Sequence, residues 1–401
     1  MGWTAAFRAR GNARRPVVTA MVALVLGFVP AMAEEGPRSI AVDPSAATPP
    51  TIDPTDEQSP EVGESGASRI TPLVAPVPFK NTQVGWGLFM LVGAIHRFDP
   101  DPSIKPSTDA VGGFYTENKS WGLVAMEMAR LRHDTWRLRG LYSHMDVRYD
   151  FYGIGEDAGS AGLSVPLEQS IDAAVGSALS HVAHSIYAGV ALMWMQTGVD
   201  LRRAPPAGLT PPAGLATTEL VAPGIQGEFD TRDDDYWPSR GSVAKLKFWL
   251  FSTAFGGSRD FQRYLGGWSW YKRLRGEQLI LATNLTTAAA TGDAPFYMLP
   301  TIGGGLYALR GYTQGRYRDH VMTTAQAEAR FHTEGRLGAT AFFGFGNVAS
   351  SVGNLSESKA LPAGGLGLRF KLTRQFPMHM RFDYAWGDSS HAFYVSLGEA
   401  F

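Results

Sequence analysis

Residues 379–386 read HMRFDYAW, and the alternation within this stretch decides the fold class. Met380, Phe382, Tyr384 and Trp386 share one parity, while the histidine, arginine and aspartate take the other. Successive side chains of a β-strand point to opposite faces of the sheet, so a period of two separates an apolar face from a polar one. The stretch therefore predicts a strand with one bulky apolar face and one charged face.

The same alternation recurs in other segments of the second half of the chain. Apolar residues of one parity oppose charged or polar residues of the other in 243–250, 278–286 and 366–372. A soluble antiparallel sandwich also alternates. Bulky, often aromatic faces opposite charged ones favour a transmembrane barrel instead, with an apolar exterior and a polar lumen.

The rest of the chain supports a barrel. After Val29 no apolar run approaches the ~18 residues that a membrane helix needs, and a closed barrel is the other structure that satisfies every backbone group in lipid. We therefore predict an all-β fold, a transmembrane antiparallel β-barrel of about 16 strands. The second half divides into segments at 241–254, 260–272, 278–289, 322–333, 338–349, 361–373, 377–387 and 391–401.

The first half of the predicted barrel is less regular. Its alternation is weaker, so the sequence does not define its strands clearly. It also leaves open whether Tyr152-Gly153-Ile154-Gly155 lies in an outer loop or in a periplasmic turn.

The N-terminus has the organisation of a secretory signal peptide. Four arginines between Arg8 and Arg15 precede an apolar run from Val17 to Val29, and Ala31-Met32-Ala33 supplies a small-x-small cleavage site. The apolar run is too short for a membrane anchor, because the hydrocarbon core is ~30 Å thick. We predict a cleaved signal peptide over residues 1–33.

Residues 34–78 are rich in proline, serine, threonine and acidic residues and contain no aromatic residue. Such a segment buries too little apolar surface to offset its conformational entropy. We predict a disordered linker over 34–78 and the barrel over 79–401.

Composition excludes several functional classes. A net charge of −1 gives no global attraction to nucleic acid, and the absence of cysteine excludes disulfides, thiol chemistry and cysteine-ligated metals. No G-x-S-x-G or zinc motif is present. His181 and His184 would point to opposite faces of a strand, so a polar turn is favoured over a metal pair. We expect no enzyme activity, catalytic residue, metal or cofactor.

The segment DTRDDDYWPSRG, residues 230–241, indicates a turn between two strands. Proline, serine and glycine with acidic flanks are typical turn residues, and an EF-hand calcium loop is excluded because its glycine and terminal glutamate are missing. The residues that define this turn motif are Asp230, Arg232, Asp233, Pro238 and Gly241.

The segment GGGLYALRGY, residues 303–312, lies in a long insertion between strands, Asp293 to His320. Its glycine run is not a phosphate-binding loop, because the GK[ST] ending and the following helix are absent. Loops of this length tend to be functional. Glu328-Ala329-Arg330-Phe331 follows it and places Glu328 on the polar parity of the next strand.

Together with the last three strands, these motifs resemble the barrel of the BamA/TamA-type assembly factors, also called the bacterial surface antigen family. The resemblance implies that the insertion is a sixth extracellular loop folded into the lumen, with Leu309, Arg310, Gly311 and Tyr312 at its tip. It also implies that Arg310 pairs with Glu328. The family's second acidic partner falls on Gly344 here. The 45 residues of the linker are too few for a periplasmic POTRA domain of ~75 residues, so a short member without POTRA domains is expected.

The last strand is expected to close the barrel. Phe393, Val395, Leu397 and Phe401 share one parity, and a terminal aromatic resembles the signal read by the barrel-insertion machinery. In the family a weak seam between first and last strands opens toward lipid for a client strand, and Gly398 would weaken that seam here.

The resemblance implies an outer-membrane location and a role in the insertion or translocation of proteins or lipids. The expected partners are outer-membrane lipids, client outer-membrane proteins and a separate periplasmic partner, with no nucleic acid. The alternative is a passive channel or structural barrel that has lost the assembly role, since fold alone does not decide function.

Overall fold

A computed structural model describes residues 71–401 apart from 99–106, 206–211, 213–214, 216, 235–236, 277, 304–308, 334, 373–378 and 389. The predicted signal peptide and residues 34–70 of the predicted linker lie outside the described residues. The first strand begins at Thr71, inside the predicted linker, and carries prolines at 72, 76 and 78. Proline is tolerated in a strand when its nitrogen faces away from the neighbouring ladder. The prolines in this segment therefore did not distinguish the strand from the proline-rich linker before it.

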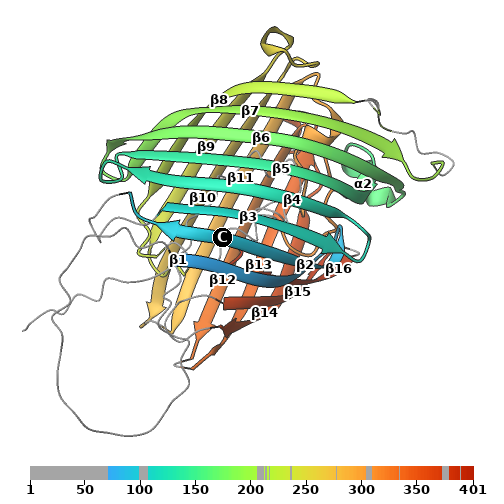
Figure 1. The fold of residues 1–401 in the computed structure, drawn as a ribbon. Coiled ribbons are helices and arrows are strands. Elements are labelled where there is room, and N and C mark those ends of the chain that lie inside the picture. The colour runs from blue at the N-terminus through green and yellow to red at the C-terminus, as the bar shows by residue number, and fades with distance from the viewer. Residues whose placement is uncertain are drawn as a thin grey trace, which may run out of the picture.

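The described residues form sixteen antiparallel strands that close into one barrel, each paired with its neighbours in chain order (Figure 1). The predicted fold class is confirmed. The strands are β1 (Thr71–Asn81), β2 (Gly85–His96), β3 (Ser107–Thr116), β4 (Trp121–Leu131), β5 (Trp136–Phe151), β6 (Val165–Ala183), β7 (Ile186–Leu201), β8 (Thr218–Asp230), β9 (Gly241–Phe251), β10 (Phe261–Arg275), β11 (Leu279–Gly292), β12 (Val321–His332), β13 (Leu337–Ala349), β14 (Leu361–Lys371), β15 (His379–Gly387) and β16 (Ser390–Leu397).

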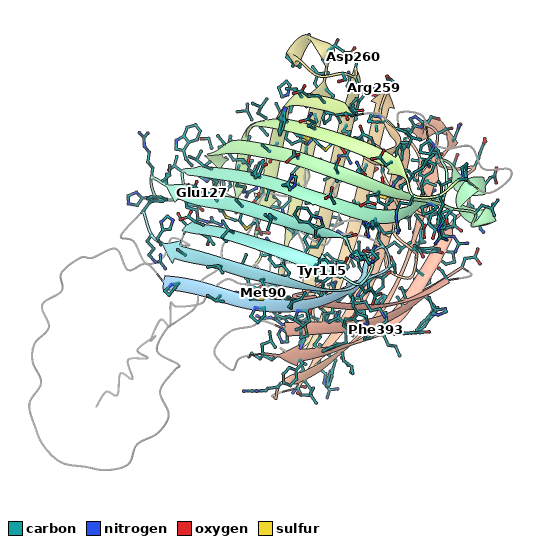
Figure 2. The ribbon with its side chains drawn as sticks, turned by 45° about the vertical axis from the view of Figure 1, so that its right-hand side comes forward. Met90, Tyr115, Glu127, Arg259, Asp260 and Phe393 are labelled. Atoms are coloured by element: carbon teal, nitrogen blue, oxygen red, sulfur yellow. The ribbon has the colours of Figure 1, made fainter. Side chains whose placement is uncertain are left out.

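The eight segments predicted over 241–401 correspond to β9 to β16. Outward positions of these strands carry bulky apolar side chains, such as Leu366 and Leu368 on β14. Arg369 has the opposite parity, so its side chain points inward and is buried. The outer surface also presents Met90, Tyr115 and Phe393 (Figure 2). Such a surface fits the lipid-facing wall of a transmembrane barrel.

The interior of the first half of the barrel is mostly apolar, so the predicted polar lumen holds there only in part. On β2, Leu88 and Met90 face outward, while Phe89 and Leu91 face inward and are buried. Most inward residues of β1 to β8 form one large apolar cluster with part of the β11–β12 loop. Arg137 and Arg139 on β5 form ion pairs with Glu228 on β8 inside the same half. Because both faces of these strands are apolar, their alternation is weak, which explains why the sequence did not define them clearly.

The two ends of the barrel differ. An even number of antiparallel strands places the start of β1 and the end of β16 at the same end, which we call the terminal end. Tyr152–Gly155 lies at the opposite end, between β5 and the short helix α2 (Glu156–Ala161). The 3₁₀ turns η2 (Thr253–Phe255), η3 (Phe296–Met298) and η4 (Val352–Asn354) also lie in connections at that end.

No helix in the described part of the chain has the length and apolar character needed to span a membrane.

Candidate functional site: the inward-folded loop and the barrel seam

The described residues of the β11–β12 connection, 293–303 and 309–320, turn back into the barrel. Its first part packs in the apolar half of the lumen, where the Phe296 ring lies 4.8 Å from that of Phe151 on β5. Further along, Leu309 and Tyr312 are buried in a second apolar cluster with side chains of β12, β13 and β14. The loop therefore spans the lumen from its apolar half toward β12–β16.

Gly311 allows the loop tip to approach β15 and β16 closely. Its φ of 108° belongs to the region that favours glycine. A Cβ at this position would lie 2.8 Å from the backbone of Trp386. The Gly311 N–H donates to the Tyr394 hydroxyl at 3.1 Å, and its carbonyl accepts from Ser390 Oγ at 2.6 Å.

Tyr312 fixes the other side of the tip. Its hydroxyl donates to the Pro362 carbonyl at 2.6 Å and accepts from the Asp388 N–H at 3.1 Å. Its ring lies over Gly387, where a Cβ would come within 2.6 Å of it. The tip is thus held by strands β14 to β16, which are far from it in sequence.

Arg310 lies between two carboxylates inside the barrel. Its guanidinium forms an ion pair with Glu328 on β12, and its Nη1 lies 2.5 Å from Asp383 Oδ2 on β15. It also lies 3.5 Å from the centroid of the Phe342 ring. Arg310 is 5% exposed and both carboxylates are 0% exposed, so the charges are desolvated and depend on one another.

The second carboxylate comes from a different place than the resemblance implied. A Cβ at Gly344 would lie 2.6 Å from the Ala325 carbonyl oxygen and 3.0 Å from Leu309 Cδ1. Position 344 therefore accommodates the loop and has no room for an acidic side chain. The missed residue is Asp383, and the available signal was its place on the charged parity of the stretch 379–386.

Further charges surround this pair. The contacts are Arg330–Glu328 at 2.9 Å, Arg369–Asp383 at 2.6 Å and Arg369–Glu399 at 2.8 Å. Arg381 Nε lies 3.4 Å from Asp383 Oδ2. We call these seven residues, Arg310, Glu328, Arg330, Arg369, Arg381, Asp383 and Glu399, the lumen charge cluster. The cluster ties the loop to strands β12, β14 and β15 and to the tail after β16. Of these residues, the sequence predicted a pairing only for Arg310 with Glu328.

The described residues of the turn motif, 230–234 and 237–241, lie at the terminal end. Asp233 accepts hydrogen bonds from Ser239 Oγ at 2.5 Å and from the Arg240 N–H at 3.2 Å, and it lies 3.1 Å from Arg273 Nη2. Burial opposes ionisation, but the bonds from Ser239 and Arg240 hold the pKa of Asp233 below its ordinary value.

The remaining turn residues also act locally. Arg232 Nη2 lies 2.5 Å from Asp230 Oδ2, and Pro238 is buried. Gly241 has a φ of 94°, and a Cβ there would lie 2.2 Å from the Thr231 carbonyl oxygen. These contacts support the structural role that the sequence suggested for this motif.

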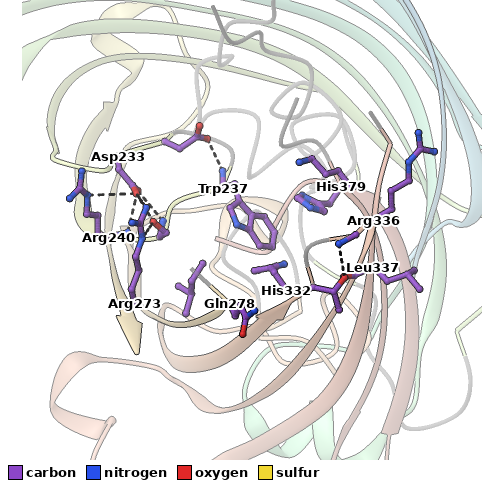
Figure 3. A pocket seen from close by; sticks show the side chains of 15 residues that line it. Asp233, Trp237, Arg240, Arg273, Gln278, His332, Arg336, Leu337 and His379 are labelled. Atoms are coloured by element: carbon purple, nitrogen blue, oxygen red, sulfur yellow. Dashed lines mark hydrogen bonds and ion pairs between the residues drawn. The ribbon is translucent and has the colours of Figure 1, made fainter. Parts of the chain in front are cut away.

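Trp237 extends from the same turn into the barrel, which the sequence did not indicate. Its ring lies 3.9 Å from that of His332 and 4.2 Å from that of His379. These side chains line a cavity of about 500 Å³ at the terminal end, together with Asp233 and Arg273 (Figure 3). The turn thus partly fills the opening of the barrel.

The histidine pair considered from the sequence lies elsewhere. His184 lies in the β6–β7 turn, and His181 Nε2 lies 2.6 Å from its carbonyl oxygen. Within the described residues no three histidine or acidic side chains are grouped so that they could hold a metal ion.

The seam between β1 and β16 differs from every other junction in the barrel. Its register contains one pair, Lys80 with Val395, whereas the β1–β2 register runs from Thr71 with Ile95 to Asn81 with Gly85. On the outside, Lys80 Nζ lies 5.1 Å from the ring centroid of Trp86 and 5.8 Å from that of Phe393. Two cation–π contacts of Lys80 thus lie at the seam, beside its single register pair.

The end of the chain departs from the expected closing strand. β16 ends at Leu397, and Gly398 has a φ of 83°. Phe401 lies inside the barrel, where Arg330 Nη2 donates to its backbone oxygen at 2.9 Å. The expectation that Phe401 continues the outer apolar face is therefore wrong, because the left-handed Gly398 ends the strand.

The family model described as the Omp85 superfamily domain matches residues 115–401. The chain belongs to the Omp85 superfamily. It is therefore an outer-membrane β-barrel, and its predicted relation to the BamA/TamA-type family is confirmed. No curated protein matches the chain. In the part of the chain that the structure describes, no region resembles a POTRA domain.

Solved structures share the barrel fold of this Omp85 protein. BamA from Haemophilus ducreyi lacking POTRA domains 1–3 matches with a TM-score of 0.57 and 14% identity, over 82% of this chain and 70% of that one. CdiB from Acinetobacter baumannii matches with a TM-score of 0.52 and 13% identity, over 82% and 64%. CdiB from Escherichia coli matches with a TM-score of 0.57 and 10% identity, over 82% and 62%. The alignments thus span less than two thirds of either CdiB chain.

Proposed function

We propose that this Omp85 protein inserts or translocates proteins, or lipids, at the outer membrane by opening the seam between β1 and β16. The observation that carries this proposal is the single register pair at that seam. A narrow antiparallel pair exchanges two backbone hydrogen bonds, so separating β1 from β16 breaks far fewer bonds than separating any other neighbouring strands.

An opened seam is a natural site for a passing strand. Backbone groups exposed to lipid cost several kcal/mol each, so a client strand that pairs with an exposed edge is stabilised there. Client outer-membrane proteins are the proposed substrates, and a separate periplasmic protein is the proposed partner that delivers them. The fold shared with BamA and CdiB supports the proposal.

The lumen supports a role beyond conduction. Apolar side chains fill most of its first half, and the β11–β12 loop crosses it. A passive channel needs a continuous polar path, which this packing does not favour. The loop and the lumen charge cluster instead hold β12 to β16 from inside the barrel, and the loop also contacts the β1–β2 turn, where the Gln314 N–H donates to Thr82 Oγ1 at 2.9 Å.

A seam lock tests the proposal. The chain has no cysteine, so Lys80→Cys with Val395→Cys introduces a unique pair at a register position whose Cα separation of ~5.5 Å suits a disulfide. The oxidised variant should lose activity, measured as outer-membrane protein and lipid composition after depletion of the wild-type protein, and a reductant should restore it. The matched control is Val74→Cys with Val92→Cys across β1 and β2.

Full activity of the oxidised seam variant would exclude opening of the seam. Unchanged outer-membrane protein and lipid levels after depletion would instead favour the structural barrel.

A further inference from the structure

The cavity at the terminal end of the barrel has an excess of positive charge (Figure 3). Apart from two histidines, the charged residues that line it are Arg240, Arg273, Arg336, Lys371, Asp233 and Asp234. Asp233 is already paired, because it lies 3.1 Å from Arg273 Nη2 and 3.8 Å from Arg240 Nε. Arg336 and Lys371 remain as cations that these contacts do not neutralise.

Arg336 and Lys371 lie side by side on the rim of the cavity. The Lys371 N–H donates to the Arg336 carbonyl at 2.8 Å, which joins the β12–β13 turn to the end of β14. In the part of the chain that the structure describes, neither side chain takes part in an ion pair. Arg336 is exposed and Lys371 is half-buried, so an anion in the surrounding water can approach both. Two neighbouring cations repel each other, and an anion placed between them is stabilised.

The chain itself contains a strongly acidic segment. Residues 53–64 read DPTDEQSPEVGE, with five acidic residues and no basic residue. No lysine or arginine occurs anywhere between residues 39 and 68. Acidic stretches of this kind commonly act as interaction tails, and their natural partner is a cationic surface. The segment and the cavity therefore have complementary charge.

The acidic segment is attached at the same end of the barrel as the cavity. β1 begins at Thr71, seven residues after Glu64. An extended chain covers ~3.3 Å per residue, so Glu64 reaches ~23 Å from Thr71 and Asp53 reaches ~60 Å. Sixteen tilted strands spaced ~4.8 Å apart enclose a barrel ~30 Å across, so the whole segment has the length to reach the cavity. A short tether also gives a millimolar local concentration, which favours even a weak contact.

We propose that residues 53–64 dock in the terminal-end cavity, with their carboxylates beside Arg336 and Lys371. Arg240, which is 72% exposed, supplies a third cation. Exposed ion pairs contribute little to stability, so this docking agrees with a linker that the barrel does not need for folding. Other acidic chains that approach this end compete with the tethered segment for the same cations. The docking does not depend on opening of the seam.

Disulfide trapping in the purified full-length protein tests the docking. The chain has no cysteine, so Val62→Cys with Gln278→Cys introduces one pair, between the acidic segment and an exposed residue that lines the cavity. The matched control is Val62→Cys with Ala183→Cys, at the exposed end of β6. β6 is five strands from β1 in one direction around the barrel, whereas β11 is six strands away in the other. The tether therefore gives the cavity position no advantage over the control.

The rate of disulfide formation and its salt dependence decide the outcome. At low ionic strength the 62–278 disulfide should form roughly tenfold faster than the 62–183 disulfide, because docking raises the local concentration at the cavity. At ~1 M salt, where charges are screened beyond ~3 Å, the preference should disappear. Equal rates at low ionic strength would overturn the docking, and a preference that persists at high salt would overturn recognition by charge.

A charge exchange identifies the cations involved. Arg336→Glu with Lys371→Glu should abolish the preference for position 278, because the carboxylates of the segment then meet like charge. Adding Asp56→Lys, Glu57→Lys and Glu61→Lys should restore it, since opposite charges again face each other. An unchanged preference in the Arg336→Glu, Lys371→Glu variant would show that these cations do not hold the segment.

A second pair of reversals controls for net charge. Arg202→Glu with Arg203→Glu changes the total charge by the same amount at exposed positions after β7, at the opposite end of the barrel. This variant should keep the preference for position 278. Heat-modifiable gel mobility establishes that each variant is folded. Loss of the preference in this control would mean that total charge, and not the cavity, attracts the segment.

Discussion

Arg310 Nη1, at the tip of the inward-folded loop, lies 2.5 Å from Asp383 Oδ2 on β15. This contact joins residues 73 positions apart. Together with the ion pair to Glu328, it places one guanidinium between two strands of the wall that are not adjacent to each other. The loop is therefore held by the closed barrel as a whole and by no single hairpin.

Removing Arg310 should release the loop. Arg310→Ala leaves two buried carboxylates without their shared partner, a change that costs about 3–5 kcal/mol in a dry interior and less in a wet lumen. We expect faster proteolysis within 293–320 and impaired function. Glu328→Gln and Asp383→Asn should each produce a smaller effect. Arg148→Ala, which removes a half-exposed ion pair with Glu168, is the control.

Double-mutant cycles then test whether the contacts are direct. Arg310→Ala combined with either carboxylate variant should be less than additive, because the interaction is lost only once. Protection of the loop from protease is the quantity to measure. Strict additivity at both pairs would contradict the arrangement of the cluster.

Introducing the family's acid at position 344 should loosen the loop. A side chain there meets the Ala325 carbonyl and Leu309, so Gly344→Asp should displace the tip and increase its protease sensitivity. Gly344→Ala should act in the same direction. Gly176→Ala is the matched control, since a Cβ at Gly176 meets no atom within 4 Å. A more protected loop in Gly344→Asp would show that the register between loop and wall is different.

Phe401 should contribute to barrel stability from inside the lumen. Its ring lies 5.2 Å from the Arg330 guanidinium and packs with Val243, Tyr271 and Ala282. Phe401→Ala should destabilise the barrel by about 3 kcal/mol, as for other buried phenylalanines. The measurement is the denaturant midpoint of heat-modifiable gel mobility. Phe343→Ala, on the outer face, should have little effect in detergent.

The turn at 231–240 should weaken in acid. The pKa of Asp233 is lowered from its ordinary value of 3.8, so its ionised form stabilises the folded turn. This stabilisation is complete above pH ~4 and is lost as the pH falls through the lower folded-state value. Hydrogen exchange of the turn should increase below pH 4 in the wild type. Asp233→Asn should exchange faster at neutral pH and show little further change on acidification.

The linker should be dispensable for barrel stability. Composition predicts that residues 34–70 lack a packed core, so their deletion should leave the thermal unfolding of the barrel unchanged. A large drop in stability, or a well-dispersed spectrum from the isolated segment, would contradict the prediction.

The sequence by itself predicted the barrel and the second half of its strands. In β9 to β16 a bulky apolar face opposes a charged one, and a period of two is a local property that a single segment carries. The loop tip and the pairing of Arg310 with Glu328 could also be predicted from the sequence, because both residues lie in short motifs close together in the chain.

The tertiary structure decided what depends on closure of the barrel. The strands of the first half have apolar residues on both faces, and only the packed lumen explains the inward set. Asp383 meets Arg310, and Phe401 meets Arg330, because closure brings β15 and the chain end next to the loop and β12. The proline nitrogens of β1 point away from β2, because the β1–β2 ladder is continuous. Which strand pairs with β1 is set by the closure of the whole barrel, and no local pattern contains it.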